Sequence, residues 1–251
     1  MKNRSFFSIA AVAFTAILIA TPANAQILWG TVSNVSTDTD VATNGTYFDA
    51  ALFQDGANSG NPVTVNGVVF NIIAHGNALD SDHFAPGSVN PPAGYTGGYI
   101  TLSSSRNPFV GGTAPGASSA YDTLLSAAEY GQNQTQTIKL SNLTVGDTYQ
   151  VEIWSSAIGK GGYITDLSGT NSVALNANTG QFVIGTFTAD ATTFSFTSNF
   201  DASSANKVNM LNAISVFDEG VISVPEPSSY ALLLSGVLAL FFLRFRRNAN
   251  A

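Results

Sequence analysis

The sequence predicts an all-β fold, a β-sandwich or jelly roll, between an N-terminal signal-peptide helix and a C-terminal transmembrane helix. Three observations lead to this fold class. Charged residues make up only 10% of the chain, whereas Gly, Ser, Thr and Asn are abundant. Short runs of Val, Ile and Phe alternate with polar residues, and turn-forming residues separate these runs. This balance is typical of extracellular β-modules, and the 45% hydrophobic content is too high for a disordered chain.

The alternation of apolar and polar side chains locates the strands. Residues 63–73 form either one strand or two strands joined by a turn at Asn66-Gly67. In residues 149–155, alternate side chains point to opposite faces, with Trp154 either exposed or in a second sheet interface. The other expected strands are residues 99–102, 135–140, 181–189, 192–198 and 208–217.

One segment, residues 118–130, has a helical pattern. Ser119 and Asp122 are candidate capping residues, and Leu124, Leu125 and Ala128 follow at helical spacing before Gly131. We expect this helix to cover one end of the sandwich.

The N-terminus predicts a secretory signal peptide over residues 1–25. Lys2 and Arg4 precede an apolar run that ends in small residues, with Ala23 and Ala25 at the two positions that a signal peptidase reads. Cleavage after Ala25 makes Gln26 the first residue of the mature chain. The alternative is a retained N-terminal membrane anchor.

The C-terminus predicts a short membrane anchor. Residues 231–243 are apolar apart from Ser235 and Gly236, and Arg244, Arg246 and Arg247 follow. Thirteen helical residues span about 20 Å, so the flanking side chains must extend the segment to cross a bilayer. The arginines favour the cytoplasmic side, which places the body outside.

Pro225-Glu226-Pro227, the apolar run and the arginine cluster stand in the order of a known signal. This order resembles the PEP-CTERM sorting signal of Gram-negative bacteria. The resemblance implies that exosortase, a membrane transpeptidase-like enzyme, processes the tail during delivery to the cell surface or extracellular matrix. Cleavage, retention and covalent replacement of the tail remain open. The domain organisation is therefore a signal peptide at 1–25, a β-sandwich domain at 26–222 and a sorting signal at 223–251.

The body shows a second resemblance. Residues 121–125, 137–151, 185–190 and 211–216 are similar to segments of galactose-binding-like jelly rolls. These segments are strands and turns, so the resemblance implies a fold and carries over no binding residue.

Charge and cysteine content limit the partners. Residues 26–224 hold 15 acidic and four basic side chains, a net charge of −11, which argues against nucleic acid and against anionic membrane surfaces. Such a body is compatible with divalent cations or neutral polysaccharide. The chain has no cysteine, so neither disulfides nor a thiol nucleophile are available.

Two acidic pairs are candidate cation sites, because Ca2+ prefers carboxylate and carbonyl oxygens. They are Asp38-Thr-Asp40 and Asp80-Ser-Asp82, although neither stands in an EF-hand pattern. Both histidines, His75 and His83, flank the second pair and could hold a transition metal with it. The alternative is a solvated polar loop.

A hydrolase has weak support. A glycosidase needs two carboxylates across the scissile bond, and Glu129 and Glu152 are the glutamates well inside the body. We expect Glu152 on a solvated polar face. Ser103-Ser104-Ser105 has no G-x-S-x-G pattern around it.

Aromatic side chains could stack on the apolar faces of sugars. We prefer Tyr95 and Tyr99, which lie in a Gly-rich loop, and Trp154; the wider set also holds Trp29, Tyr47 and Tyr163.

These observations predict an exported, non-catalytic protein with a structural or adhesive body. The alternative is a carbohydrate-binding module for exopolysaccharide, and a secreted hydrolase is the least favoured. The expected partners are signal peptidase, exosortase and the membrane, with no certain cofactor besides the candidate Ca2+.

Overall fold

The computed structural model describes residues 25–55, 62–75, 99–103, 106–110, 118–158, 162–202, 207–221 and 235–236. The strands of this part are β1 (Leu28–Trp29), β2 (Ser33–Asn34), β3 (Thr46–Asp55), β4 (Val63–Val65), β5 (Val68–His75), β6 (Ile100–Ser103), β7 (Arg106–Val110), β8 (Ala127–Gln132), β9 (Gln136–Ser141), β10 (Thr148–Ser155), β11 (Ile164–Leu167), β12 (Val173–Asn176), β13 (Gln181–Thr188), β14 (Thr193–Phe200), β15 (Val208–Leu211) and β16 (Ala213–Gly220). The helical elements are the 3-10 turn η1 (Asp38–Asp40) and helix α1 (Ser119–Ser126).

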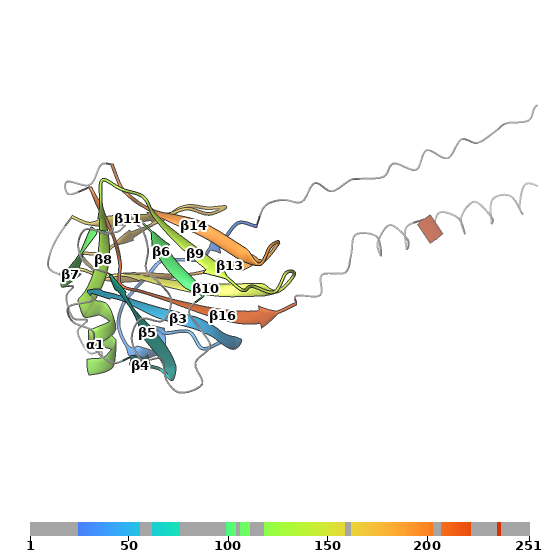
Figure 1. The fold of residues 1–251 in the computed structure, drawn as a ribbon, viewed down its shortest axis with the longest axis horizontal. Coiled ribbons are helices and arrows are strands. Elements are labelled where there is room, and N and C mark those ends of the chain that lie inside the picture. The colour runs from blue at the N-terminus through green and yellow to red at the C-terminus, as the bar shows by residue number, and fades with distance from the viewer. Residues whose placement is uncertain are drawn as a thin grey trace, which may run out of the picture.

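The largest sheet has eight strands in the described residues. Its order is β1-β13-β10-β16-β3-β5-β4, and β2 pairs with β13 beside β1. Neighbouring strands are antiparallel except β3 and β5, which are parallel. Between these two strands the chain forms β4, which lies at the edge of the sheet and is antiparallel to β5. The last strand, β16, therefore lies in the middle of the sheet, between β10 and β3 (Figure 1).

A second sheet, in the order β12-β11-β14-β9-β6, faces one side of the large sheet (Figure 1). The two sheets enclose the larger hydrophobic core, which we call the inter-sheet core. It joins side chains of β10 and β16, such as Val151 and Val216, to side chains of β9 and β14, such as Ile138 and Phe196. Alternation explains this arrangement, because every second residue of these strands is apolar and turns inward.

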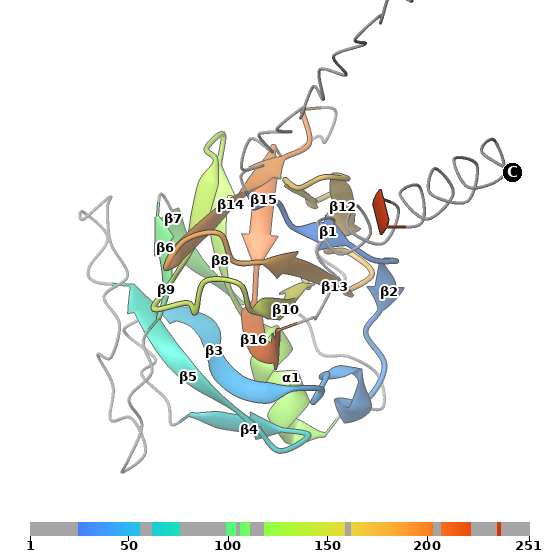
Figure 2. The same ribbon diagram turned by 90° about the vertical axis from the view of Figure 1, so that its right-hand side faces the viewer.

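The opposite side of the large sheet carries its own hydrophobic core, which we call the helix-side core. Helix α1 contributes Tyr121, Leu124 and Leu125, and the hairpin formed by β4 and β5 contributes further side chains, among them Phe70. The helix packs against β4, and Figure 2 shows both on this side of the sheet. The large sheet is thus covered on both faces, so all eight residues of β10 are buried.

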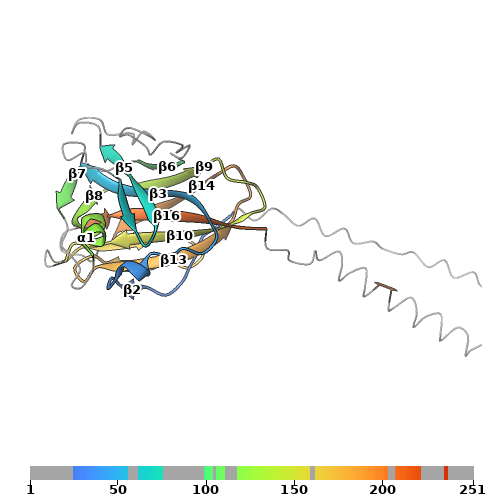
Figure 3. The same ribbon diagram turned by 90° about the horizontal axis from the view of Figure 1, so that it is seen from below.

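A small sheet, β15-β8-β7, lies with α1 at one end of the molecule (Figure 3). Strand β8 follows α1 directly in the chain and contacts β3 of the large sheet. This end lies opposite the end at which β16 finishes (Figures 1 and 3).

Of the two alternatives for residues 63–73, two strands with a turn at Asn66-Gly67 is the one observed. Residues 63–73 form two strands, β4 and β5, and both turn residues have positive φ, 48° at Asn66 and 81° at Gly67. Two consecutive left-handed residues match the right-handed twist of a hairpin, and Asn-Gly is the pair that adopts them at least cost.

The predicted helix is wrong beyond Ser126. Residues 127–132 form β8, because pairing with β7 and β15 outweighs the helical spacing that had included Ala128. Ser118, rather than Ser119, caps the helix, since its Oγ accepts a hydrogen bond from the backbone N–H of Tyr121 at 3.2 Å.

The single strand predicted over residues 208–217 is two strands, separated at Asn212. The Asn212 side chain is fully buried, and its Nδ2 donates to the carbonyl oxygens of Leu125 at 2.8 Å and Ser156 at 3.1 Å. The amide thus joins helix α1 to the end of β10, which a strand pattern alone does not reveal.

The all-β fold class is confirmed as several packed sheets, and the other predicted strands correspond to β6, β9, β10, β13 and β14. Across the ranges given above, no helix is long and apolar enough to cross a membrane. The predicted signal-peptide helix falls almost wholly outside the described residues, and so does the predicted transmembrane segment apart from Ser235 and Gly236.

Candidate functional site

The residues that follow the predicted signal cleavage point are part of the folded body. The backbone N–H of Ala25 donates to Asp190 Oδ2 at 2.8 Å, and β1 pairs with β13. Ile27 and Trp29 are only 1% and 2% exposed. The bond between Ala25 and Gln26 therefore lies at the point where the chain joins the inter-sheet core, while Ala23 lies outside the described residues.

Trp29 fixes this N-terminal segment. Its Nε1 donates to the carbonyl oxygen of Ser168 at 3.0 Å, and its ring meets Phe196 edge to face at 5.5 Å between centroids. Gly185 makes room for the indole, because a Cβ at that position would lie 2.5 Å from Trp29 Cε3.

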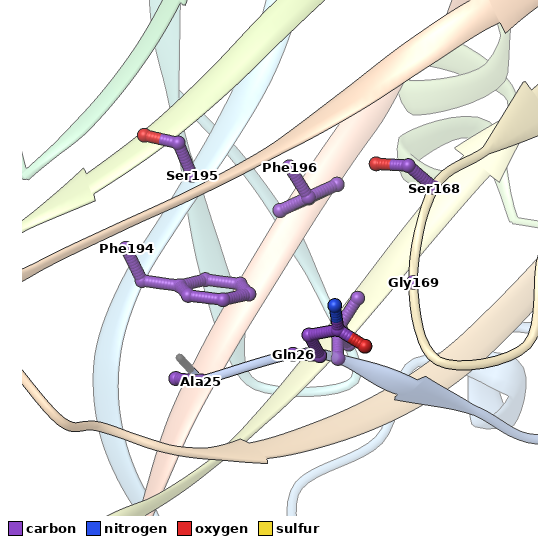
Figure 4. Close-up of a pocket in the computed structure, with 8 residues that line it drawn as sticks. Ala25, Gln26, Ser168, Gly169, Phe194, Ser195 and Phe196 are labelled. Atoms are coloured by element: carbon purple, nitrogen blue, oxygen red, sulfur yellow. The ribbon is translucent and has the colours of Figure 1, made fainter. Parts of the chain in front are cut away.

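A cavity of about 270 Å³ lies beside the same segment. Figure 4 shows the Phe194 ring turned toward the segment of Ala25 and Gln26 that precedes β1, with Ser195 on the other side of its own strand. Phe194 is 7% exposed, so little of its ring is available to a ligand. None of the residues predicted to bind sugar or metal lines this cavity.

Trp154 is wrong as a sugar-stacking residue. It is fully buried in the helix-side core, where it meets Phe70 edge to face at 5.6 Å. This face of the large sheet is covered by helix α1 and the β4–β5 hairpin, so Trp154 lies neither at the surface nor at an interface with the second sheet. Tyr99 is half-buried and packs against Phe48 at 5.2 Å between ring centroids. Tyr95 lies outside the described residues.

The expectation that Glu152 is solvated is also wrong. Its side chain is fully buried, because β10 is a central strand and residues near η1 close over it. Glu152 Oε2 accepts a hydrogen bond from the backbone N–H of Ala42 at 2.9 Å. Burial, with a smaller effect of the nearby Asp40 charge, raises the pKa of Glu152 to about 8, so the carboxyl is protonated at neutral pH.

A polar network surrounds this carboxyl. The Tyr121 hydroxyl accepts a hydrogen bond from Trp154 Nε1 at 3.1 Å and donates to Asp40 Oδ2 at 3.2 Å. Burial raises the pKa of Tyr121 above its ordinary value, so the hydroxyl remains neutral. Sequence patterns missed this network. Its signal in the sequence was Glu152 and Trp154 on one face of an expected strand, with the apolar Ile153 between them.

Glu129, the other glutamate considered for catalysis, lies on β8 in the small sheet and is fully buried. The two glutamates thus belong to different sheets, and neither has an exposed surface.

The pair Asp38-Thr-Asp40 forms η1. The Asp40 carboxylate accepts hydrogen bonds from the backbone N–H groups of Ser36 and Thr37, at 2.5 and 3.0 Å. Asp38 Oδ1 accepts from the backbone N–H of Ser118 at 3.0 Å, and hydrogen bonds from Ser118 hold the pKa of Asp38 below its ordinary value. These carboxylates tie the N-terminal turn to helix α1.

In the part of the chain that the structure describes, no group of three or more acidic or histidine side chains could hold a metal ion. The second candidate metal site is not covered, since its members Asp80, Asp82, His83 and the side chain of His75 lie outside the described residues.

An open depression of about 390 Å³ lies where the start of β3 meets the β4–β5 turn. Tyr47 and Phe217 form its aromatic wall, and Thr43, Asn66 and Gly67 lie at its rim. Tyr47 is 38% exposed, the largest exposure of an aromatic ring in the described residues. The sequence had placed Tyr47 in the wider aromatic set, but the strand that carries it was not predicted.

The C-terminal residues test the prediction of a sorting signal. Residues 223–247 match the family model of the PEP-CTERM protein-sorting motif. The chain carries a PEP-CTERM sorting motif. The matched range contains Pro225, Glu226, Pro227 and the three arginines, so the predicted signal is confirmed, although these residues lie outside the described structure. The motif supports an exported protein that associates with the membrane through this segment and is targeted to exosortase.

No curated protein and no solved structure is significantly similar to the chain. The resemblance of the body to galactose-binding-like jelly rolls therefore stays a prediction.

Proposed function

We propose that this protein is delivered by its PEP-CTERM motif to the cell surface or extracellular matrix, where its body acts without catalysis as a structural or adhesive module. The observation that carries the proposal is the motif at residues 223–247. It begins three residues after Gly220, the last residue of strand β16. The sorting signal thus follows the folded body without an intervening domain.

Removal of residues 1–25 is compatible with the folded body. Strand β1 begins at Leu28, so a chain that starts at Gln26 keeps all of it. We assign residues 1–25 to a signal peptide, 26–222 to the exported β-domain, which we expect to be a jelly roll, and 223–251 to the sorting signal.

A non-catalytic body is supported by the position of its glutamates. Glycoside hydrolysis needs two carboxyl groups that reach the same bond of a bound sugar. Glu129 and Glu152 are both fully buried and lie on different sheets. A secreted hydrolase is accordingly the least favoured function.

Carbohydrate binding is the second candidate. The observation that favours it is the open depression at Tyr47, which offers an exposed aromatic ring with polar groups at its rim.

Intact-mass analysis of the protein extracted from cells tests the proposal, in the wild type and in a strain that lacks exosortase. We expect a form that begins at Gln26 and ends near Pro225-Glu226-Pro227 only when exosortase is present. A mass that still includes Ala251 in both strains would mean that the tail is a plain anchor. A Pro225→Ala, Pro227→Ala double variant is the matched control, because it alters the motif and leaves the apolar run and arginines in place.

A further inference from the structure

We propose that the depression at Tyr47 is a binding site for a neutral sugar ring of a polysaccharide. This inference deepens the proposed function, since it depends on a body that is displayed outside the cell, and it names the class of ligand that the body takes. The argument rests on a fixed aromatic ring, on the polar groups around it and on the absence of charge in its lining.

The ring of Tyr47 is held in a fixed position. Its hydroxyl donates to the carbonyl oxygen of Val69 on β5 at 2.9 Å, and its ring meets Phe217 of β16 edge to face at 5.9 Å. The side chain therefore bridges β3 and β5 and keeps part of its surface exposed. A ring that is already ordered loses little conformational freedom on binding, which favours stacking against the apolar face of a pyranose.

Polar groups at the rim of the depression can form hydrogen bonds with the hydroxyls of a sugar ring. Asn66 Nδ2 donates to the carbonyl oxygen of Val41 at 2.8 Å, which fixes the amide and leaves its Oδ1 as an acceptor. Thr43 is exposed and adds a hydroxyl that can donate or accept. At Gly67 no heavy atom lies within 4 Å of the position that a Cβ would take, so a ligand can approach this side closely.

The residues that line the depression are uncharged, which favours an uncharged ligand. The depression is lined by Thr43, Tyr47, Asn66, Gly67, two valines and Phe217, none of which is charged. An anionic sugar would lack a cationic partner there and would meet an acidic body. An apolar wall with a few polar groups at the rim is the usual arrangement of small-molecule sites, and it suits an uncharged saccharide.

The test is saccharide binding by the full-length protein, purified in a detergent without a sugar headgroup. The probes are a panel of immobilised neutral oligosaccharides, with glucose, mannose, galactose and xylose units, and a matched panel of uronic-acid oligosaccharides. We expect binding to neutral members only. Tyr47→Ala should weaken it about 10-fold or more, since the stacking surface is lost.

Three further variants make the test specific. Tyr47→Phe keeps the ring and removes its tether, so we expect a loss of about 2- to 3-fold, and Thr43→Val should cause a similar loss through the missing hydroxyl. Leu28→Ala is the matched control, because Leu28 is 55% exposed on β1, at the opposite edge of the same sheet. It should leave binding unchanged. Thermal unfolding of each variant checks that the fold is intact.

The proposal is overturned if no neutral saccharide binds, or if Tyr47→Ala and Leu28→Ala bind equally well. It is also overturned if saccharides do not bind and Tyr47→Ala abolishes self-association in sedimentation, since the depression is then an interface between copies. Failure here is distinct from failure of the proposed function, because the masses of the processed chain depend on the tail and not on Tyr47.

Discussion

The two faces of the large sheet differ in chemistry, although the same strands supply both. On β10, Tyr149, Val151 and Ile153 enter the inter-sheet core, while Gln150, Glu152 and Trp154 face the other side. The first face packs on a regular second sheet. The second is closed by short elements, η1, α1 and the β4–β5 hairpin, and holds a protonated glutamate inside a polar network.

The two faces of the sheet therefore have different roles: one stabilises the fold, and the other leaves an opening to solvent. Where a sheet packs on a sheet, apolar side chains of both interdigitate in a close-packed core. This packing stabilises the fold and tolerates few changes in side-chain volume. A face closed by loops and a hairpin can hold buried polar groups and leave an opening at its margin. The depression at Tyr47 lies at that margin, between β3 and the hairpin turn.

The largest expected effect falls on the inter-sheet core. Trp29→Ala should lower the free energy of unfolding by about 3–5 kcal/mol, because it empties a site that is 2% exposed and removes the bond to Ser168. Urea unfolding measures the loss. The neighbouring variant Leu28→Ala should change stability by no more than about 0.5 kcal/mol. Equal losses at the two positions would mean that β1 does not dock as described.

On the helix side, Glu152 should make stability depend on pH. Its pKa is raised in the folded state from the ordinary value of 4.5 to about 8, so the folded protein keeps a proton that the unfolded chain releases. The stabilisation is complete below pH 4.5 and is lost as the pH rises toward 8, with a slope of up to about 1.4 kcal/mol per pH unit. Urea unfolding between pH 4 and 9 measures it.

Two variants isolate this pH dependence. Glu152→Gln should remove that part of the slope, because the amide does not titrate. Glu219→Gln changes an exposed glutamate at the end of β16 and should leave the slope in place. A wild-type slope that survives Glu152→Gln unchanged would refute the assignment.

A smaller effect compares one hydroxyl on each face. Tyr121→Phe should cost about 1–3 kcal/mol, because buried Trp154 Nε1 loses its acceptor and Asp40 loses a donor. Tyr149→Phe, on the inter-sheet side, should cost less than about 1 kcal/mol, since its partner is a single backbone N–H, that of Thr144, whose residue is exposed. Thermal or urea unfolding of both variants gives the comparison, and the reverse order would contradict it.

The smallest effect concerns the hairpin that closes the helix side. Gly67→Ala should destabilise the protein by about 1 kcal/mol, because its φ of 81° disfavours a Cβ although no atom crowds the position. Thr64→Ala, on the exposed side of β4, should fall within about 0.5 kcal/mol of the wild type. A neutral Gly67→Ala variant would mean that the turn relaxes to another type.

Most strands that form the inter-sheet core were predictable from sequence, whereas on the helix side only the hairpin and the first part of helix α1 were. Alternation of apolar residues gave β9, β10, β13 and β14, and the Asn66-Gly67 pair gave the hairpin. Strand β3 was not predicted. It is central, with neighbours on both sides and buried residues on both faces, so its run from Tyr47 to Phe53 lacks a simple alternation.

The errors at the candidate site have the same physical origin. Glu152 was expected on a solvated polar face, and Trp154 either at the surface or in a second sheet interface. Alternation along a strand says nothing about which distant segments close over a face. The break at Asn212 depends on a bond between elements far apart in the chain, from Asn212 to Leu125. Local patterns do not contain such pairs.

The position of β16 has a mechanical consequence. Any pull on the C-terminal tail enters the body at the end of this strand, where Phe217 touches Tyr47. A polysaccharide bound at Tyr47 would be only a few residues of β16 away from the tether. Tension between the cell and the matrix would then pass through the paired ends of two central strands, β16 and β3.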